Sequence, residues 1–159
     1  MPGHTFHHEV VEKSDGSFLV TVNKTGSTHP DGAPTVEDVV IELDRHPGTV
    51  THEWDLKQLL DEGRHALEAD PVDWAVVYDP ADNTIVVSAR FQGVVKLGYD
   101  DWIVWLLAPR KGWGRNRRGE DLNRFLLTPL DTTGRPIANP DMALGSSNHP
   151  DFEWNWYQH

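Results

Sequence analysis

The sequence predicts an all-β fold, and within that class a partial β-propeller of about two four-stranded blades plus the start of a third. Two short helical inserts are expected between the strands. An internal repeat supports this prediction, because residues 10–20 resemble residues 76–87 and each stretch reads as strand, polar turn and strand. Seven Trp in 159 residues also suit layered β structure, since Trp buries a large area and needs a partner for its N–H.

Tight turns close both copies of the repeated hairpin. The dipeptides Asp15-Gly16 and Asp82-Asn83 favour the backbone angles of short hairpin turns. A β-sandwich with coincidental alternation of apolar residues is the alternative architecture. The doubled turn favours the propeller, because four antiparallel strands per repeat are the signature of a propeller blade.

Two further strands are expected after each hairpin. The aligned stretches are 38–43 with 93–97, and 48–56 with 101–106. In this alignment Trp54 matches Trp105, so the fourth strand of each unit ends near a Trp.

Two segments have helical spacing of apolar residues. Asp55 is suited to cap a helix over residues 56–67, whose apolar residues lie on one side: Leu56, Leu59, Leu60, Ala66 and Leu67. Residues 119–127 carry a weaker helical pattern through Leu122, Phe125 and Leu126.

The whole chain, residues 1–159, is expected to form a single partial propeller domain. Its approximate blades span residues 5–56 and 73–108. A long loop with a short helix covers residues 109–151, and residues 152–159 form the first strand of a third blade. Two blades and one strand do not close a ring, so we expect a fragment or an internally deleted gene product. The open sheet edges also make a homo-oligomer possible, in which three copies complete six blades.

Composition excludes several classes of partner and chemistry. The formal net charge of -11 argues against binding nucleic acid or anionic membrane surfaces. No apolar run approaches the ~20 residues that span a bilayer, so no membrane insertion is expected. The absence of Cys removes disulfides, thiolate catalysis and Cys-ligated zinc. Because the N-terminus lacks an apolar signal region, either the protein is cytoplasmic or its record begins downstream of a lost signal.

Four residues could carry chemistry at the axis of a propeller. His7 and His8 lie just before the first strand of the first blade, Arg90 ends the second strand of the second blade, and His159 follows the first strand of the third blade. The innermost strands line the central channel, so these side chains should converge there. A zinc site built from His7, His8 and His159 is one alternative. Adjacent His residues rarely face one ion, and no His-Glu-x-x-His spacing exists, so no metal site is expected.

The six remaining histidines are expected to be solvent-exposed. They are His4, His29, His46, His52, His65 and His149.

Several stretches resemble the bacterial arylsulfate sulfotransferases. The resemblance covers nearly the whole chain, and the motifs are specific when taken together. They include Phe6-His7-His8-Glu9, Glu53-Trp54-Asp55-Leu56, residues 81–97, 104–113 and 126–137, and residues 152–158 leading into His159.

This resemblance implies a periplasmic, six-bladed propeller that uses no nucleotide sulfate donor and no other cofactor. In that family a histidine attacks the sulfur of an aryl sulfate, holds the sulfuryl group as sulfohistidine and passes it to a phenol, with ping-pong kinetics. The expected partners are therefore a small-molecule aryl sulfate and a phenol. Carried over to this chain, His159 is the nucleophile, and Arg90 holds the sulfuryl oxygens. His8, more than His7, acts as an acid or charge stabiliser, and His7 contributes to substrate binding.

The sequence departs from the family pattern at three places. The family continues its Asp-Trp-Ala motif with His-x-Asn, whereas here Asp73-Trp74-Ala75 runs straight into Val76. Phe91 stands where family members often have His, and the linker over residues 65–70 is short. Losing donors from a charge-stabilising site could cost ~10²-fold or more in rate.

Other readings of the same residues remain open. Arg90 could be a structural arginine paired with a neighbouring carboxylate, and His159 is the last residue of the chain. A non-catalytic propeller-derived binding or assembly module is the alternative function, and a metal-dependent hydrolase is a third.

Overall fold

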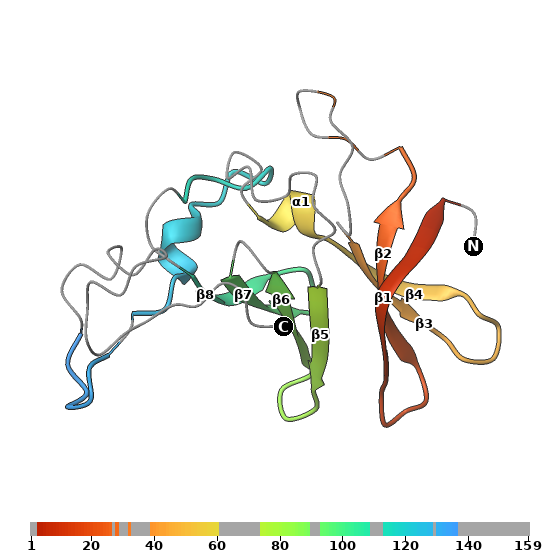
Figure 1. Cartoon of the computed structure of the whole chain (residues 1–159), viewed down its shortest axis with the longest axis horizontal. Coiled ribbons are helices and arrows are strands. Elements are labelled where there is room, and N and C mark those ends of the chain that lie inside the picture. The colour runs from red at the N-terminus through yellow and green to blue at the C-terminus, as the bar shows by residue number, and fades with distance from the viewer. Residues whose placement is uncertain are drawn as a thin grey trace.

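The computed structural model describes residues 3–26, 28, 32, 39–60, 74–89, 93–108, 113–128 and 130–136, without the side chains of His7, His8, Trp74 and Ala89. Within these residues the fold consists of two four-stranded antiparallel sheets, each with its strands in sequence order (Figure 1). The all-β prediction is confirmed. The strands are β1 His4–Glu12, β2 Phe18–Lys24, β3 Val39–Leu43, β4 Val50–Asp55, β5 Trp74–Asp79, β6 Thr84–Ala89, β7 Gly93–Gly98 and β8 Ile103–Leu107.

Both predicted hairpin turns are present. Gly16 has a φ of +84° and Asn83 a φ of +54°, so each turn contains a residue in the left-handed region that Gly and Asn tolerate best. The first turn is closed by hydrogen bonds from Lys13 N–H to the Ser17 carbonyl at 2.8 Å and from Gly16 N–H back to the Lys13 carbonyl at 2.9 Å.

The two sheets repeat each other strand by strand, including an irregularity at the same place. The β3–β4 register shifts between Glu42 and Leu43, and the β7–β8 register shifts between Lys96 and Leu97. When the two shifts are aligned, Val50 corresponds to Ile103, the first residue of β8.

With that alignment, the expected match of Trp54 with Trp105 is wrong by two residues. Trp105 corresponds to His52, and Trp54 corresponds to Leu107. A shift of two residues keeps each side chain on the same face of its strand, so periodicity alone does not reveal it.

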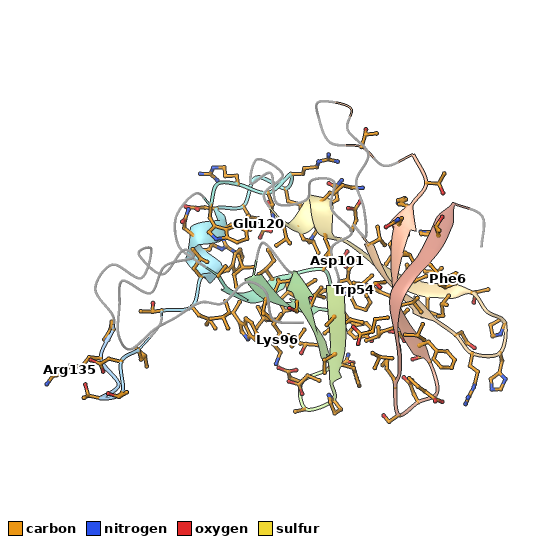
Figure 2. All side chains as sticks on the ribbon, viewed as in Figure 1. Phe6, Trp54, Lys96, Asp101, Glu120 and Arg135 are labelled. Carbon is orange, nitrogen blue, oxygen red and sulfur yellow. The ribbon has the colours of Figure 1, made fainter. Side chains whose placement is uncertain are left out.

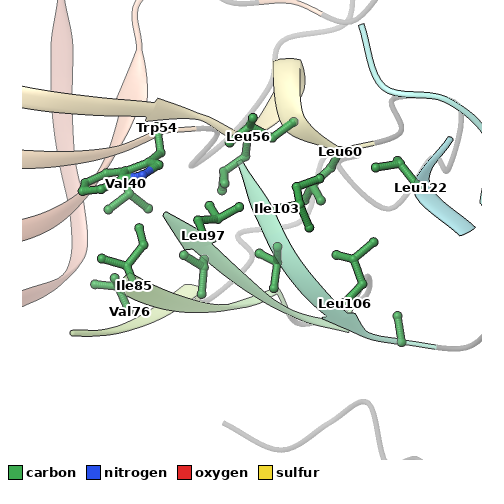
Figure 3. Packing of buried hydrophobic residues seen from close by; sticks show 14 of the residues in the cluster. Val40, Trp54, Leu56, Leu60, Val76, Ile85, Leu97, Ile103, Leu106 and Leu122 are labelled. Atoms are coloured by element: carbon green, nitrogen blue, oxygen red, sulfur yellow. The ribbon is translucent and has the colours of Figure 1, made fainter. Parts of the chain in front are cut away.

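The hydrophobic core lies between the two sheets (Figures 2 and 3). The first sheet contributes Leu19, Val40 and Trp54, and Trp54 is fully buried. The Trp54 indole N–H donates to the Gly98 carbonyl of the second sheet at 2.9 Å. The second sheet contributes a set of buried aliphatic residues: Val76, Ile85, Val87, Val95, Leu97, Ile103 and Leu106.

The sheets use non-equivalent faces to pack on each other. Leu19 of the first sheet faces the core, but its counterpart Val86 is on the far side of the second sheet. Conversely, Val87 faces the core, whereas its counterpart Val20 belongs to a separate cluster on the other face of the first sheet. The contact is therefore head-to-tail, and its faces are not exchanged by a two-fold axis.

Strands β1 and β5 lie side by side and run in the same direction (Figure 1). Near the start of β5, Glu9 Oε2 accepts a hydrogen bond from Val76 N–H at 2.9 Å. Toward the other end, Lys13 Nζ lies 4.6 Å from the ring centre of Tyr78. The first strands of the two sheets thus meet along their lengths.

The predicted helix after Asp55 is shorter than expected. Asp55 Oδ1 accepts from Lys57 N–H at 3.1 Å, so the predicted cap is confirmed, but α1 spans only Leu56–Leu59. Leu60 is extended and 2% exposed, because leaving the helix carries its side chain into the core. Asn116 Nδ2 bonds the Leu59 carbonyl at 3.3 Å and satisfies the helix end. Residues 61–67 lie outside the described residues.

The weaker helical prediction is confirmed as a single turn. A 3-10 helix, η1, spans Leu122–Phe125, and Asp121 Oδ1 accepts from Asn123 N–H at 3.1 Å at its start. The helix ends because Leu126 turns toward the second sheet, where Leu127 N–H bonds the Leu106 carbonyl at 2.8 Å. None of the helices in the described residues is long and apolar enough to cross a bilayer. The predicted strand over residues 152–159 lies outside the described part of the chain.

Candidate active site

The predicted histidine pair lies in a bulge of β1. Regular pairing with β2 stops after Phe6 and resumes at Val10, with Thr21 alone opposite the residues in between. Those residues are His7, His8 and Glu9. Bulges of this kind redirect side chains and are frequent beside functional sites.

The equivalent place in the second sheet has no bulge. Strand β5 pairs with β6 in unbroken register, and Ala75 alone lies opposite Ser88. The first sheet therefore carries three residues where the second carries one. Sequence alignment of the repeats did not reveal this difference, because the matched stretch began at Val10.

Glu9 ties the bulge to both sheets. Its main-chain N–H donates to the Thr21 hydroxyl at 3.3 Å, which replaces a ladder hydrogen bond within the first sheet. Its carboxylate Oε2 accepts from Val76 N–H at 2.9 Å, which joins the bulge to β5. Thr21, which accepts the first of these bonds, is 1% exposed.

The end of β6 lies near the start of β5, and Arg90 follows it in sequence. Ala89, the last residue of β6, pairs with Trp74, the first residue of β5. Since β1 and β5 run in the same direction and meet at Glu9 and Val76, the bulge lies toward this end of the sheets.

The predicted site residues are only partly described. The backbones of His7 and His8 belong to β1, but their side chains lie outside the described atoms. Arg90 and His159 also lie outside the described residues. Their convergence stays a prediction.

Two histidines expected to be exposed are partly buried, each beside a carboxylate. His4 Nε2 lies 3.3 Å from Glu53 Oε2, and His52 Nε2 lies 3.0 Å from Asp101 Oδ1. Exposure is confirmed for His46. The prediction failed for His52 because strand alternation puts it on the face of β4 that also carries Trp54, toward the second sheet. The ring centroids of His52 and Trp54 are 4.2 Å apart.

A basic side chain also stabilises the Glu53 carboxylate. Lys24 Nζ lies 2.7 Å from Glu53 Oε1. Partial burial alone raises the pKa of Glu53, but the hydrogen bonds and charges of Lys24 and His4 outweigh it and lower that pKa. The carboxylate is therefore held ionised beside the start of β1.

A polar cluster that sequence analysis missed lies between the sheets, near the first hairpin turn. Lys13 is 7% exposed, and its Nζ lies 3.1 Å from Glu42 Oε1. The Tyr99 hydroxyl donates to Glu42 Oε2. Burial lowers the pKa of Lys13, but hydrogen bonds with Tyr99, Glu42 and Asp15 raise it overall. No local signal predicts this cluster, because its members are far apart in sequence and meet only through packing of the sheets.

Metal binding has no support from the described side chains. Within the described residues no three His, Asp or Glu gather closely enough to hold a metal ion. The zinc alternative involves His7, His8 and His159, whose side chains fall outside that set.

The fold and the bulge define an all-β protein of repeated four-stranded sheets with a histidine pair on its first strand. The family model "Arylsulfotransferase (ASST)" matches residues 1–159, and the chain belongs to that family. The resemblance drawn from its motifs is confirmed.

Two curated relatives are similar to this chain over most of its length. They are the arylsulfate sulfotransferases AssT of Escherichia coli O6:H1 strain CFT073 and of Lelliottia amnigena. Each is 31% identical over 193 aligned residues, covering 96% of this chain and 31% of the relative. The chain thus spans less than a third of the length of these relatives. The aligned length exceeds the 159 residues of the chain, so the relatives contain internal segments that have no counterpart here.

Proposed function

We propose that this chain forms part of a β-propeller that transfers a sulfuryl group from an aryl sulfate to a phenol. The transfer proceeds through a sulfohistidine, by a ping-pong sequence without a nucleotide donor. Membership of the arylsulfotransferase family supports this proposal. The observation that carries it is the bulge in β1, which sets His7 and His8 apart from the regular ladder, beside the start of β5.

Head-to-tail packing supports the propeller architecture. A two-fold sandwich would use the same face of both sheets, whereas here each sheet uses a different face. Such a contact can be repeated, so further sheets could pack in the same way around an axis. On the far face of the second sheet, Val77 is 59% exposed and Trp105 is partly exposed, as expected if another sheet covers them.

The expected blade boundaries are part of this proposal. Blades over residues 5–56 and 73–108 include the two observed sheets apart from His4, the first residue of β1. In the proposal a long loop over 109–151 leads to the first strand of a third blade at 152–159. A periplasmic location is part of the same proposal, because the family resemblance implies it.

The proposed chemistry proceeds in two balanced steps. In the first, the neutral His159 imidazole attacks sulfur, an N–S bond forms, and the S–O bond breaks with its electron pair leaving on the phenolate. Arg90 stabilises the negative sulfuryl oxygens with its planar donors, and His8 donates a proton to the departing oxygen. His7 contributes to binding the sulfate ester. In the second step a phenol attacks sulfur, its proton returns to His8, and the N–S bond breaks to restore His159.

Colour release from 4-nitrophenyl sulfate in the presence of phenol tests this proposal. We expect the wild-type chain to release 4-nitrophenolate, and the activity to resist chelators. Without acceptor, intact-mass spectrometry should detect a chain heavier by one sulfuryl group. His159→Ala should abolish both signals, whereas His46→Ala, which removes an exposed histidine from the β3–β4 turn, should leave both unchanged.

Two results would contradict the proposal. The first is the absence of both colour release and a sulfuryl adduct in the wild-type chain. The second is full retention of activity in His159→Ala. Loss of activity on chelation would favour a metal-dependent hydrolase.

A further inference from the structure

Glu9 occupies the last position of the histidine bulge and holds it at two points. Its main-chain N–H bonds the Thr21 hydroxyl, and its carboxylate bonds the main chain of Val76. The first contact lies within the first sheet, and the second crosses to the neighbouring sheet. Among the described residues, no other hydrogen bond joins β1 directly to the main chain of β5.

The Val76 amide is suited to a fixed contact of this kind. β5 is at the edge of its sheet, so amides on its outer side have no ladder partner. A partly buried amide without an acceptor costs about 1–3 kcal/mol. A carboxylate is a stronger acceptor than a neutral oxygen, so Glu9 satisfies this amide well.

Fixing Glu9 has a direct consequence for the residue before it. Residues in the bulge lack the regular ladder bonds that orient a strand, and Thr21 alone lies opposite them. The peptide group between His8 and Glu9 contains the Glu9 N–H, which donates to the Thr21 hydroxyl. Because β5 also holds the Glu9 side chain, the backbone of His8 is constrained at its C-terminal side.

We propose that Glu9 is a positioning residue, whose carboxylate holds the β1 bulge against β5 and thereby orients His8 for sulfuryl transfer. The catalytic part of this inference rests on the proposed function. The orientation of the histidines can be measured without any activity.

The test compares Glu9→Ala with Glu9→Gln and with a matched control. Gln keeps an oxygen acceptor at the same distance, whereas Ala removes it. Glu12→Ala is the control, because Glu12 is on the same strand but pairs with Arg45 at 3.1 Å, where both side chains are about half exposed. Thr21→Val removes the second anchor while keeping the side-chain shape.

Nuclear magnetic resonance gives the readout that does not depend on activity. In Glu9→Ala we expect the imidazole signals of His7 and His8 to move and the Val76 amide to exchange about tenfold faster. Glu9→Gln and Glu12→Ala should leave these signals close to wild type. If Glu9→Ala fails to fold, Thr21→Val carries the test, and it should move the same two imidazole signals.

Kinetics give the second readout. In Glu9→Ala we expect kcat for 4-nitrophenyl sulfate to fall about 10²-fold with little change in KM, because a small misplacement of a reacting group has that effect. Glu9→Gln should restore kcat to within a few-fold of wild type.

The inference is overturned if the Val76 amide loses protection in Glu9→Ala while the imidazole signals of His7 and His8 stay in place. Glu9 would then be a structural contact only. If the wild-type chain shows no turnover, the proposed function fails, and the resonance measurements still decide whether Glu9 orients the histidines.

Discussion

The same ion pair occurs in both sheets with its charges exchanged. In the first sheet Lys13 Nζ, directly after the end of β1, lies 3.1 Å from Glu42 Oε1 of β3. At the equivalent places in the second sheet Asp79, at the end of β5, lies 2.8 Å from Lys96 of β7. Each lysine also contacts an aspartate of its own hairpin turn, at 3.2 Å in the first sheet and 2.8 Å in the second.

The two pairs differ in what packs over them. The second sheet covers the first pair, placing the Tyr78 ring 4.6 Å from Lys13 and donating a hydrogen bond from Tyr99 to Glu42. The Lys13 and Glu42 side chains are 5% and 11% exposed, whereas those of Lys96 and Asp79 are 12% and 35% exposed. The same arrangement of strands therefore gives a buried ion pair in the first sheet and a more exposed one in the second.

The largest expected contrast concerns another equivalent pair, Trp54 and Leu107. Trp54→Ala should lower the free energy of unfolding by about 3–5 kcal/mol, because it empties a fully buried site and removes one of the donors to the Gly98 carbonyl. Leu107→Ala, at a partly exposed site, should cost roughly 1 kcal/mol. Urea denaturation measures both, and equal losses would contradict the asymmetry between the sheets.

The exchanged ion pairs give the next contrast. Lys13→Met should lower the free energy of unfolding by about 3 kcal/mol, since it leaves the Glu42 charge buried with only the Tyr99 hydroxyl as donor. Lys96→Met should cost less, because water screens the pair it breaks. A similar midpoint shift for both variants in chemical denaturation would show that burial does not distinguish the pairs.

The same contrast shows which features of the structure can be predicted from the sequence. The hairpin turns were predictable because Asp15-Gly16 and Asp82-Asn83 carry local backbone preferences, and Asp55 predicted the start of α1 for the same reason. Long-range packing was not predictable. Packing between distant segments ends α1 at Leu59 and buries Lys13. The residues next to Leu59 and Lys13 in sequence do not indicate either outcome.

The candidate site was less predictable than the fold. The histidine pair was identified from its place in the repeat and from its resemblance to a family motif, but the bulge was not. Periodicity detects alternation along one strand, whereas a bulge is defined by the register with its partner, here Thr21. The two-residue error in matching Trp54 with Trp105 has the same origin, because register is defined by two paired strands and cannot be read from one.

Stability at high pH gives a smaller contrast. Burial and the bond to Glu42 raise the pKa of Tyr99, and the pKa of Lys13 is raised despite its burial. The folded protein therefore retains protons that the unfolded chain releases above about pH 10. The free energy of unfolding should thus be insensitive to these groups below about pH 10. It should then fall as pH rises, by up to about 1.4 kcal/mol per pH unit for each retained proton.

Denaturation curves recorded across this pH range measure the effect. Lys13→Met and Tyr99→Phe should each remove part of the slope, since each removes one of the two groups. Slopes that match wild type in both variants would assign the alkaline loss of stability to other residues.

The smallest expected change in stability comes from making β1 resemble β5. Deleting His7 and His8 leaves Glu9 alone opposite Thr21, as Ala75 is opposite Ser88. Thr21 shares the face of β2 that carries Leu19, toward the second sheet, so Glu9 should keep its direction toward Val76. We therefore expect the free energy of unfolding to change by less than about 1 kcal/mol.

The proposed sulfuryl transfer, in contrast, should be lost in this deletion. The double substitution of His7 and His8 by Ala is the control, because it removes the imidazoles but keeps the bulge. If the deletion costs several kcal/mol while the double substitution does not, the two extra residues serve the packing of β1. If both variants stay stable, the first sheet contains residues that its own pairing does not need, as expected of a segment retained for chemistry.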